Sequence, residues 1–164
     1  MTIILKNKHT LKVDDFYFKC CIGKHGLSKK KKEGDKKTPK GIYLIENLYF
    51  RKDRIKKPET SIKCIEIKKS MGWCNDLDHP KQYNRLINNN KKIKHEKLNR
   101  RDNKYDLLIP IKYNFKKPIL GQGSCIFIHL TNNYKPTAGC IALKKKDFLI
   151  MLKLINKKTK IKIS

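Results

Sequence analysis

Ile126-Phe127-Ile128-His129-Leu130 and Gly139-Cys140-Ile141 are two apolar stretches, and they carry a histidine and a cysteine. The segment 130–138 between them is rich in turn-forming residues and predicts a long hairpin loop. Side chains alternate along a strand, which places Cys125 and His129 on the same face. If the two strands pair antiparallel, His129 faces Cys140, with Cβ atoms roughly 4.5–5.5 Å apart. The pattern therefore predicts a thiol and an imidazole in contact.

Such a pair has a recognised chemistry. An imidazole can take the proton of a cysteine thiol, which makes the sulfur nucleophilic, and can later protonate a leaving amine. Gly139 has no Cβ, so a substrate carbonyl can approach closely, and the amides of Gly139 and Cys140 are candidate oxyanion donors. The alternative is a hydrogen-bonded core histidine and a buried cysteine that only packs, as in an inactive binding module. The surrounding motifs favour the enzyme.

Further motifs precede the two stretches in a fixed order. They are Lys32-Glu33-Gly34-Asp35, Thr38-Pro39-Lys40-Gly41, Met71-Gly72-Trp73-Cys74-Asn75-Asp76, Tyr83-Asn84-Arg85, His95-Glu96, Tyr105-Asp106-Leu107 and Gly121-Gln122-Gly123-Ser124. Together with His129 and Pro136-Thr137-Ala138-Gly139-Cys140, this order resembles a compact bacterial branch of the L,D-transpeptidase catalytic domain family, the YkuD type. The family signature usually has a second histidine where Ala138 stands, and often Asn or Arg where Ala142 stands.

The resemblance implies an acyl transfer on peptidoglycan stem peptides without a cofactor or metal. Cys140 would attack the carbonyl of the L-residue in an L–D peptide bond and release D-alanine, with His129 as base and then acid. Gly139 and Thr137 would shape the oxyanion turn. The thioester would then pass to an amine, which gives a cross-link, or to water, which makes the protein an L,D-carboxypeptidase that trims recycled stem peptides. The other motif residues are expected to line the substrate groove: Asp35, Thr38, Trp73, Asn75 and Tyr83.

The formal net charge of +27 is typical of a nucleic-acid-binding protein, which is a further alternative. However, 36 of the 41 basic residues are lysines, and Ile and Asn are also abundant. This is the composition that A/T-rich codons produce, and arginine, the preferred reader of base edges, is scarce. We therefore expect no specific nucleic-acid partner.

The sequence shows no signal peptide, no run of roughly 20 apolar residues and no paired-cysteine zinc spacing. These features favour the cytoplasm, with most of the six cysteines reduced and buried, whereas the family resemblance implies the cell envelope.

The periodicity predicts one mainly β domain over residues 1–164, a sandwich or open barrel with a C-terminal helix. Residues 81–103 form a polar, irregular insertion with a short helix around 95–100. Asp147 is expected to cap a helix over 148–155. Strands are expected over 2–6, 10–14, 16–22, 42–48, 62–68, 105–112, 125–130, 139–143 and 159–164.

Overall fold

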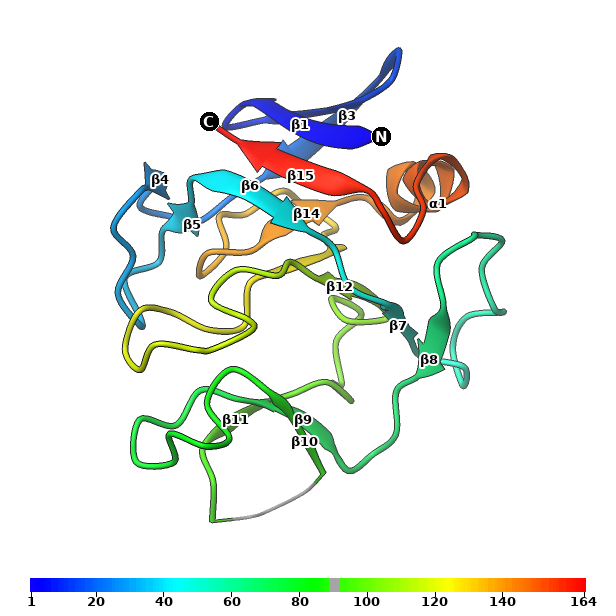
Figure 1. Ribbon diagram of the computed structural model, residues 1–164. Coiled ribbons are helices and arrows are strands. Elements are labelled where there is room, and N and C mark those ends of the chain that lie inside the picture. Colours follow the sequence, from blue (N-terminus) through cyan, green and yellow to red (C-terminus); the bar gives the residue numbers. More distant parts are fainter. Residues whose placement is uncertain (89–91) are drawn as a thin grey trace.

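Most strands of the computed structural model, which describes residues 1–88 and 92–164, belong to one curled sheet (Figure 1). Within the described residues this sheet has ten strands, in the order β6 (Gly41–Leu44), β15 (Lys160–Ile163), β1 (Thr2–Asn7), β2 (Thr10–Val13), β3 (Phe16–Cys21), β14 (Ile141–Leu143), β13 (Phe127–Leu130), β12 (Leu107–Pro110), β7 (Leu48–Phe50) and β8 (Cys64–Glu66). Two smaller sheets are β10 (Leu86–Asn88), β9 (Met71–Cys74) and β11 (His95–Lys97), and β4 (Leu27–Ser28) with β5 (Thr38–Pro39). The predicted mainly β fold is confirmed.

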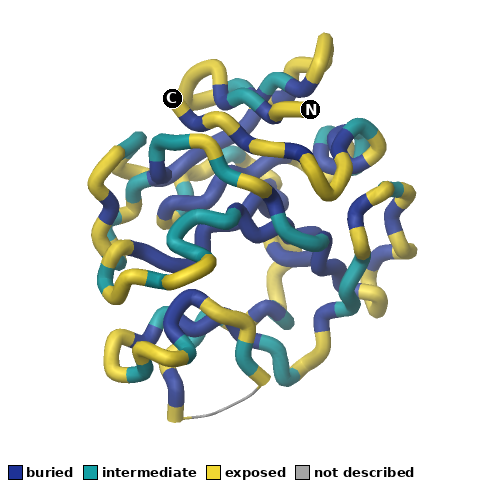
Figure 2. The backbone as a smooth tube through the Cα atoms, in the orientation of Figure 1, coloured by how far each residue is buried: buried dark blue, intermediate teal, exposed yellow. Residues whose placement is uncertain are grey.

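The curled sheet has an apolar core on each face, because its central strands alternate. Ile128 and Leu130 of β13 lie in the larger core, together with helix α1 (Lys145–Leu154). Phe127 lies in a smaller core with Trp73 of β9 and Cys140. The buried segments run through the middle of the molecule in Figure 2. Strand β13 is thus buried on both faces, which fits its nearly unbroken apolar sequence.

Helix α1 begins earlier than predicted. Its N-cap is Lys144, which has an extended backbone and makes no side-chain cap, so Asp147 is not the capping residue. Asp147 lies in the first turn instead, where a carboxylate interacts favourably with the positive end of the helix dipole. Phe148, Met151 and Leu152 are buried and anchor the helix on the sheet.

Strands β13 and β14 pair in parallel, so the predicted antiparallel hairpin is wrong. The register aligns Ile128 with Ile141 and His129 with Ala142. The connecting loop runs back along the sheet, where Thr137 forms an isolated bridge with Gly23, and the chain then re-enters the sheet in the original direction. Cys140 is therefore displaced along the strand from His129, and it lies beside Phe127.

The predicted short helix around residues 95–100 is also wrong. His95–Lys97 forms β11, because these residues pair with β9 and tertiary pairing outweighs local propensity. The predicted strand over 42–48 is divided into β6 and β7, since Glu46 turns to donate its amide to the Pro110 carbonyl. Residues 89–91 of the polar insertion lie outside the described residues.

The remaining predicted strands are confirmed within a few residues, including β15 at residues 160–163. No helix in the described ranges is long and apolar enough to cross a membrane.

Candidate active site

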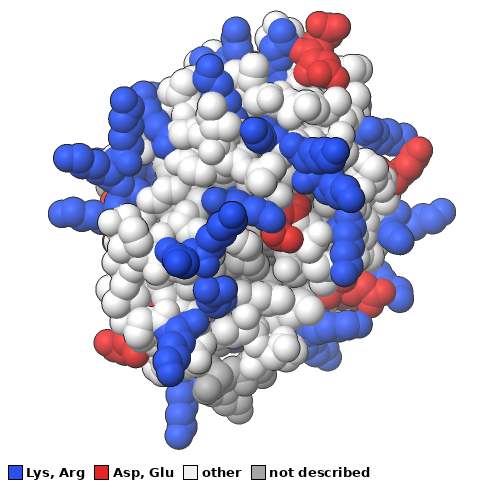
Figure 3. Space-filling view, viewed as in Figure 1, with Lys and Arg blue, Asp and Glu red and all other residues white. Residues whose placement is uncertain are grey.

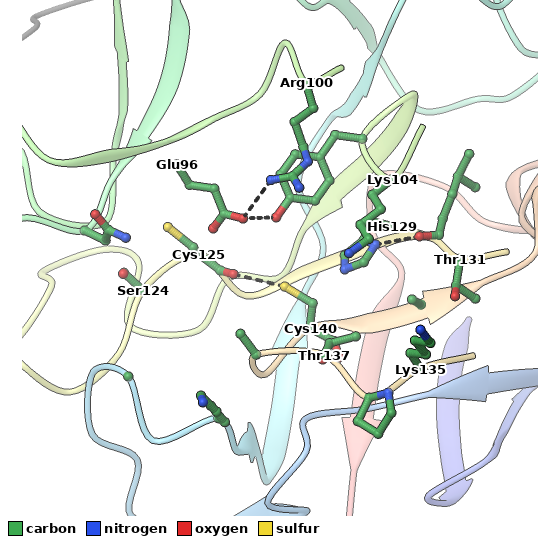
Figure 4. Close-up of a pocket in the computed structure, with 18 of the residues that line it drawn as sticks. Glu96, Arg100, Lys104, Ser124, Cys125, His129, Thr131, Lys135, Thr137 and Cys140 are labelled. Atoms are coloured by element: carbon green, nitrogen blue, oxygen red, sulfur yellow. Dashed lines mark hydrogen bonds and ion pairs between the residues drawn. The ribbon is translucent and has the colours of Figure 1, made fainter. Parts of the chain in front are cut away.

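A cavity of about 580 Å³ opens on the side of the sheet that carries the smaller core. Its wall includes His129 from β13, Cys140 at the entry to β14 and Glu96 from β11 (Figure 4). The loop before β5 contributes Lys31 and Glu33. Segments that are far apart in the sequence therefore meet at one site.

Cys140 and His129 lie on the same side of the sheet, and each has a defined hydrogen bond. The Cys140 thiol donates to the Cys125 carbonyl at 3.2 Å and accepts from the Phe127 amide at 3.4 Å. Nδ1 of His129 is 2.8 Å from the Leu130 carbonyl oxygen. A carbonyl can only accept, so in the neutral ring Nδ1 carries the proton and the lone pair lies on Nε2. Figure 4 shows this second ring nitrogen on the side of Cys140.

Both groups are neutral at neutral pH. Burial raises the pKa of the Cys140 thiol to about 12, and the nearby Glu96 carboxylate adds to this rise. Burial lowers the pKa of His129 to about 4, and the positive charges of Lys104 and Arg100 act in the same direction. The resting pair is therefore a thiol and a neutral imidazole, which suits a base that takes the proton only when substrate is attacked.

The turn before Cys140 is held by two hydroxyl groups. The Thr137 hydroxyl donates to the Cys140 carbonyl at 2.6 Å and accepts from the Gly139 amide at 3.1 Å. Fully buried Thr38 donates to the Gly139 carbonyl at 2.8 Å and accepts from the Gly23 amide at 2.9 Å. The Gly139 amide is thus already used, so the Cys140 amide is the better candidate for an oxyanion donor.

Only glycine fits at position 139. Its φ is +137°, a conformation that residues with a Cβ rarely adopt. A Cβ there would lie 2.8 Å from the Lys37 carbonyl oxygen, which is backbone and cannot move aside.

The residues predicted to line the groove are separated by the fold. Asn75 lines the cavity, and its buried Oδ1 accepts no hydrogen bond from the described residues. Thr38 and Asp35 instead support the neighbouring loops. Tyr83 is fully buried and donates to Glu33 at 2.5 Å. Trp73 lines a second cavity of about 360 Å³ with Phe115.

Several cavity residues received no role from the sequence. Glu96 accepts a hydrogen bond from the Tyr105 hydroxyl, and burial raises the pKa of its carboxyl. Arg100, Lys104 and Lys31 also line the wall. Glu96 and Tyr105 belong to motifs that support the family resemblance, and this was the sequence signal that could have indicated a role for them. Lys31 and Lys104 had none, because lysine occurs throughout this chain, and Arg100 stands outside the quoted motifs.

The described residues offer no metal centre. They contain no group of three or more His, Cys, Asp or Glu side chains that could hold an ion. All six cysteines are free. Basic side chains are scattered over the face in Figure 3, with no single stripe.

A fold with a buried thiol and imidazole around one cavity defines a candidate cysteine acyl-transfer enzyme. The family model described as the L,D-transpeptidase catalytic domain, YkuD, matches residues 2–163. The chain therefore belongs to the YkuD L,D-transpeptidase family. The comparisons with curated proteins and with solved structures gave no match.

Proposed function

We propose that this protein is a cysteine-dependent L,D-transpeptidase that acts on peptidoglycan stem peptides through a thioester on Cys140. The observation that supports the proposal is the unprotonated Nε2 of His129, which lies on the same cavity wall as the Cys140 thiol. Membership of the YkuD family supports the reaction class.

The first half-reaction starts from the neutral pair. Sγ of Cys140 attacks the carbonyl carbon of the L-centre in the L–D bond while Nε2 of His129 takes the thiol proton. The Cys140 amide donates to the oxyanion. The intermediate collapses when the C–N bond breaks, the D-alanine nitrogen receives the proton from His129, and the thioester remains.

The second half-reaction reverses these roles. An amine of another stem attacks the thioester carbonyl, His129 takes the amine proton, and Cys140 leaves and recovers it as a thiol. The new amide is a cross-link. Water in place of the amine gives trimmed stem peptide and restores the same enzyme.

The charge of the cavity wall supports an anionic substrate. Five basic residues and two acidic ones line it. Lys31 and Arg100 are paired with Asp35 and Asp102, so the positive excess comes from Lys36, Lys104 and Lys135. Stem peptides carry free carboxylates, which a positive field attracts.

The test is incubation of the purified protein with tetrapeptide muropeptides, with and without an added amine, followed by mass spectrometry. We expect loss of D-alanine together with dimers or amine-exchanged products. Trimmed monomers alone would support the carboxypeptidase alternative. No loss of D-alanine would contradict the proposal.

Three variants assign the residues. Cys140→Ala should abolish turnover and keep the fold, and measurable activity would remove Cys140 from the nucleophile role. His129→Gln should lower turnover by about 10²–10⁴-fold. Cys125→Ser is the matched control, because this buried thiol also lines the cavity but donates to the Trp73 carbonyl. A loss of rate in Cys125→Ser without a loss of stability would mean that the wrong thiol was chosen.

A further inference from the structure

Lys31 is a buried lysine in a chain whose lysines are mostly exposed. Its side chain is only 3% exposed. Its methylene groups pack so tightly on Gly123 that a Cβ there would lie 3.0 Å from Cδ and Cε. Burying an ammonium is costly, so such residues are rare and are normally paired. Here the partner is Asp35, at 2.7 Å from Nζ.

The ammonium lies at the turn that presents the thiol. Nζ of Lys31 is 3.7 Å from the point where a Cβ of Gly139 would stand. Lys31 lines the cavity and Asp35 does not, so the ion pair presents its positive end to the site. The Asp35 carboxylate is also shared with the amides of Lys32 and Lys37, at 2.8 and 2.9 Å.

We propose that Lys31 is a positioning residue of the acyl-transfer site: it places a positive charge beside Cys140 and stabilises the thiolate that forms during attack. This inference rests on the proposed function, because it assumes that the sulfur of Cys140 ionises during turnover. An ion pair that only secured its loop would not need to face the cavity.

The positive charge of Lys31 matters because the other groups around Cys140 do not favour its thiolate. Besides Lys31, the titratable groups that act on its thiol are Glu96, Tyr105, Cys125 and Cys21, and His129 lies on the same cavity wall. None of these five is a cation in the resting state, and Glu96 opposes ionisation. The charge of Lys31 acts in the opposite direction and lowers the pKa of the thiol. The other basic residues of the wall are Lys36, Arg100, Lys104 and Lys135.

The test is the rate at which iodoacetamide alkylates Cys140 in the folded full-length protein between pH 7 and 9, with the site located by mass spectrometry. Below the thiol pKa this rate follows the thiolate fraction. We expect Lys31→Met to lower it about tenfold, since an opposite charge nearby typically shifts a pKa by about one unit or more. Lys31→Arg should keep most of the rate. Lys30→Met, the same change at an exposed lysine of the same loop, should not alter it.

A second variant separates charge from loop structure. Asp35→Asn breaks the ion pair but keeps the ammonium, so alkylation should be as fast as in the wild type or faster. If Lys31 acted only through the loop, Asp35→Asn would slow alkylation as much as Lys31→Met does, and that result would overturn the proposal. An unchanged rate in folded Lys31→Met would overturn it as well.

Two further readouts make the result unambiguous. In concentrated urea all variants should alkylate at the wild-type rate. If Lys31→Met does not fold, Asp35→Asn alone decides: an alkylation rate at or above that of the wild type supports the proposal, and a lower rate overturns it. Muropeptide turnover is measured separately. If the variants show these alkylation differences but the wild-type protein releases no D-alanine, the proposed function is contradicted and the electrostatic role of Lys31 is supported.

Discussion

The hydroxyl of Thr38 should be a major stabiliser of the active-site turn. Replacement by the isosteric Val removes the donor to the Gly139 carbonyl and the acceptor from the Gly23 amide. Thr38 is fully buried, so water cannot replace either bond. Each orphaned buried group costs about 1–3 kcal/mol, which sums to about 2–6 kcal/mol. We expect a loss of about 3 kcal/mol, or a melting temperature lower by ~6–12 °C for a chain of this size.

Urea unfolding followed by circular dichroism measures this loss, and the m-value should stay unchanged. Thr38→Ser is the matched control, because it keeps the hydroxyl and removes one methyl group, at a cost of about 1 kcal/mol. The reasoning is refuted if Thr38→Val unfolds within about 0.5 kcal/mol of the wild type, or if the Ser variant is the less stable of the two.

Three other predictions follow from the same contacts. First, protonation of His129 should switch off thioester formation near pH 4, where its lowered pKa lies, and an acid limb near pH 6.5 would contradict the buried neutral base. Second, the unfolded histidine titrates near 6.5 and therefore binds its proton more readily than the folded one. The contribution of His129 to the free energy of unfolding should therefore fall by about 3 kcal/mol as the pH drops from 7 to 4. His129→Gln should lack this part of the fall, and identical pH profiles of urea unfolding would refute it. Third, a Cβ at Gly23 would lie 2.5 Å from the Lys36 carbonyl oxygen and 3.1 Å from Cα of Gly139. Gly23→Ala should therefore lower the free energy of unfolding by more than about 2 kcal/mol and slow acylation. A variant with wild-type stability and rate would contradict this and show that the loop can shift to make room for a Cβ.

The sequence was informative where local pattern determines structure. Alternation along residues 125–130 placed Cys125, Phe127 and His129 on one face, and the structure puts them there. The ordered motifs identified the family over nearly the whole chain. A feature can be predicted from the sequence when the residues that form it are neighbours in the chain.

What the sequence did not reveal depends on contacts between distant segments. The parallel pairing of β13 and β14 requires the loop to bridge Gly23, more than one hundred residues earlier in the chain. Thr38 was expected in the groove but supports Gly139 from beneath. Lys31 could not be distinguished among 36 lysines until its burial was known. None of these roles leaves a local signature.

The most direct test of the central claim is mass spectrometry of the intact protein, acid-quenched soon after mixing with a tetrapeptide stem. We expect an adduct of the tripeptide acyl group on Cys140, sensitive to hydroxylamine and missing in Cys140→Ala. An adduct on a different cysteine, or release of D-alanine by the Cys140→Ala protein, would contradict the account.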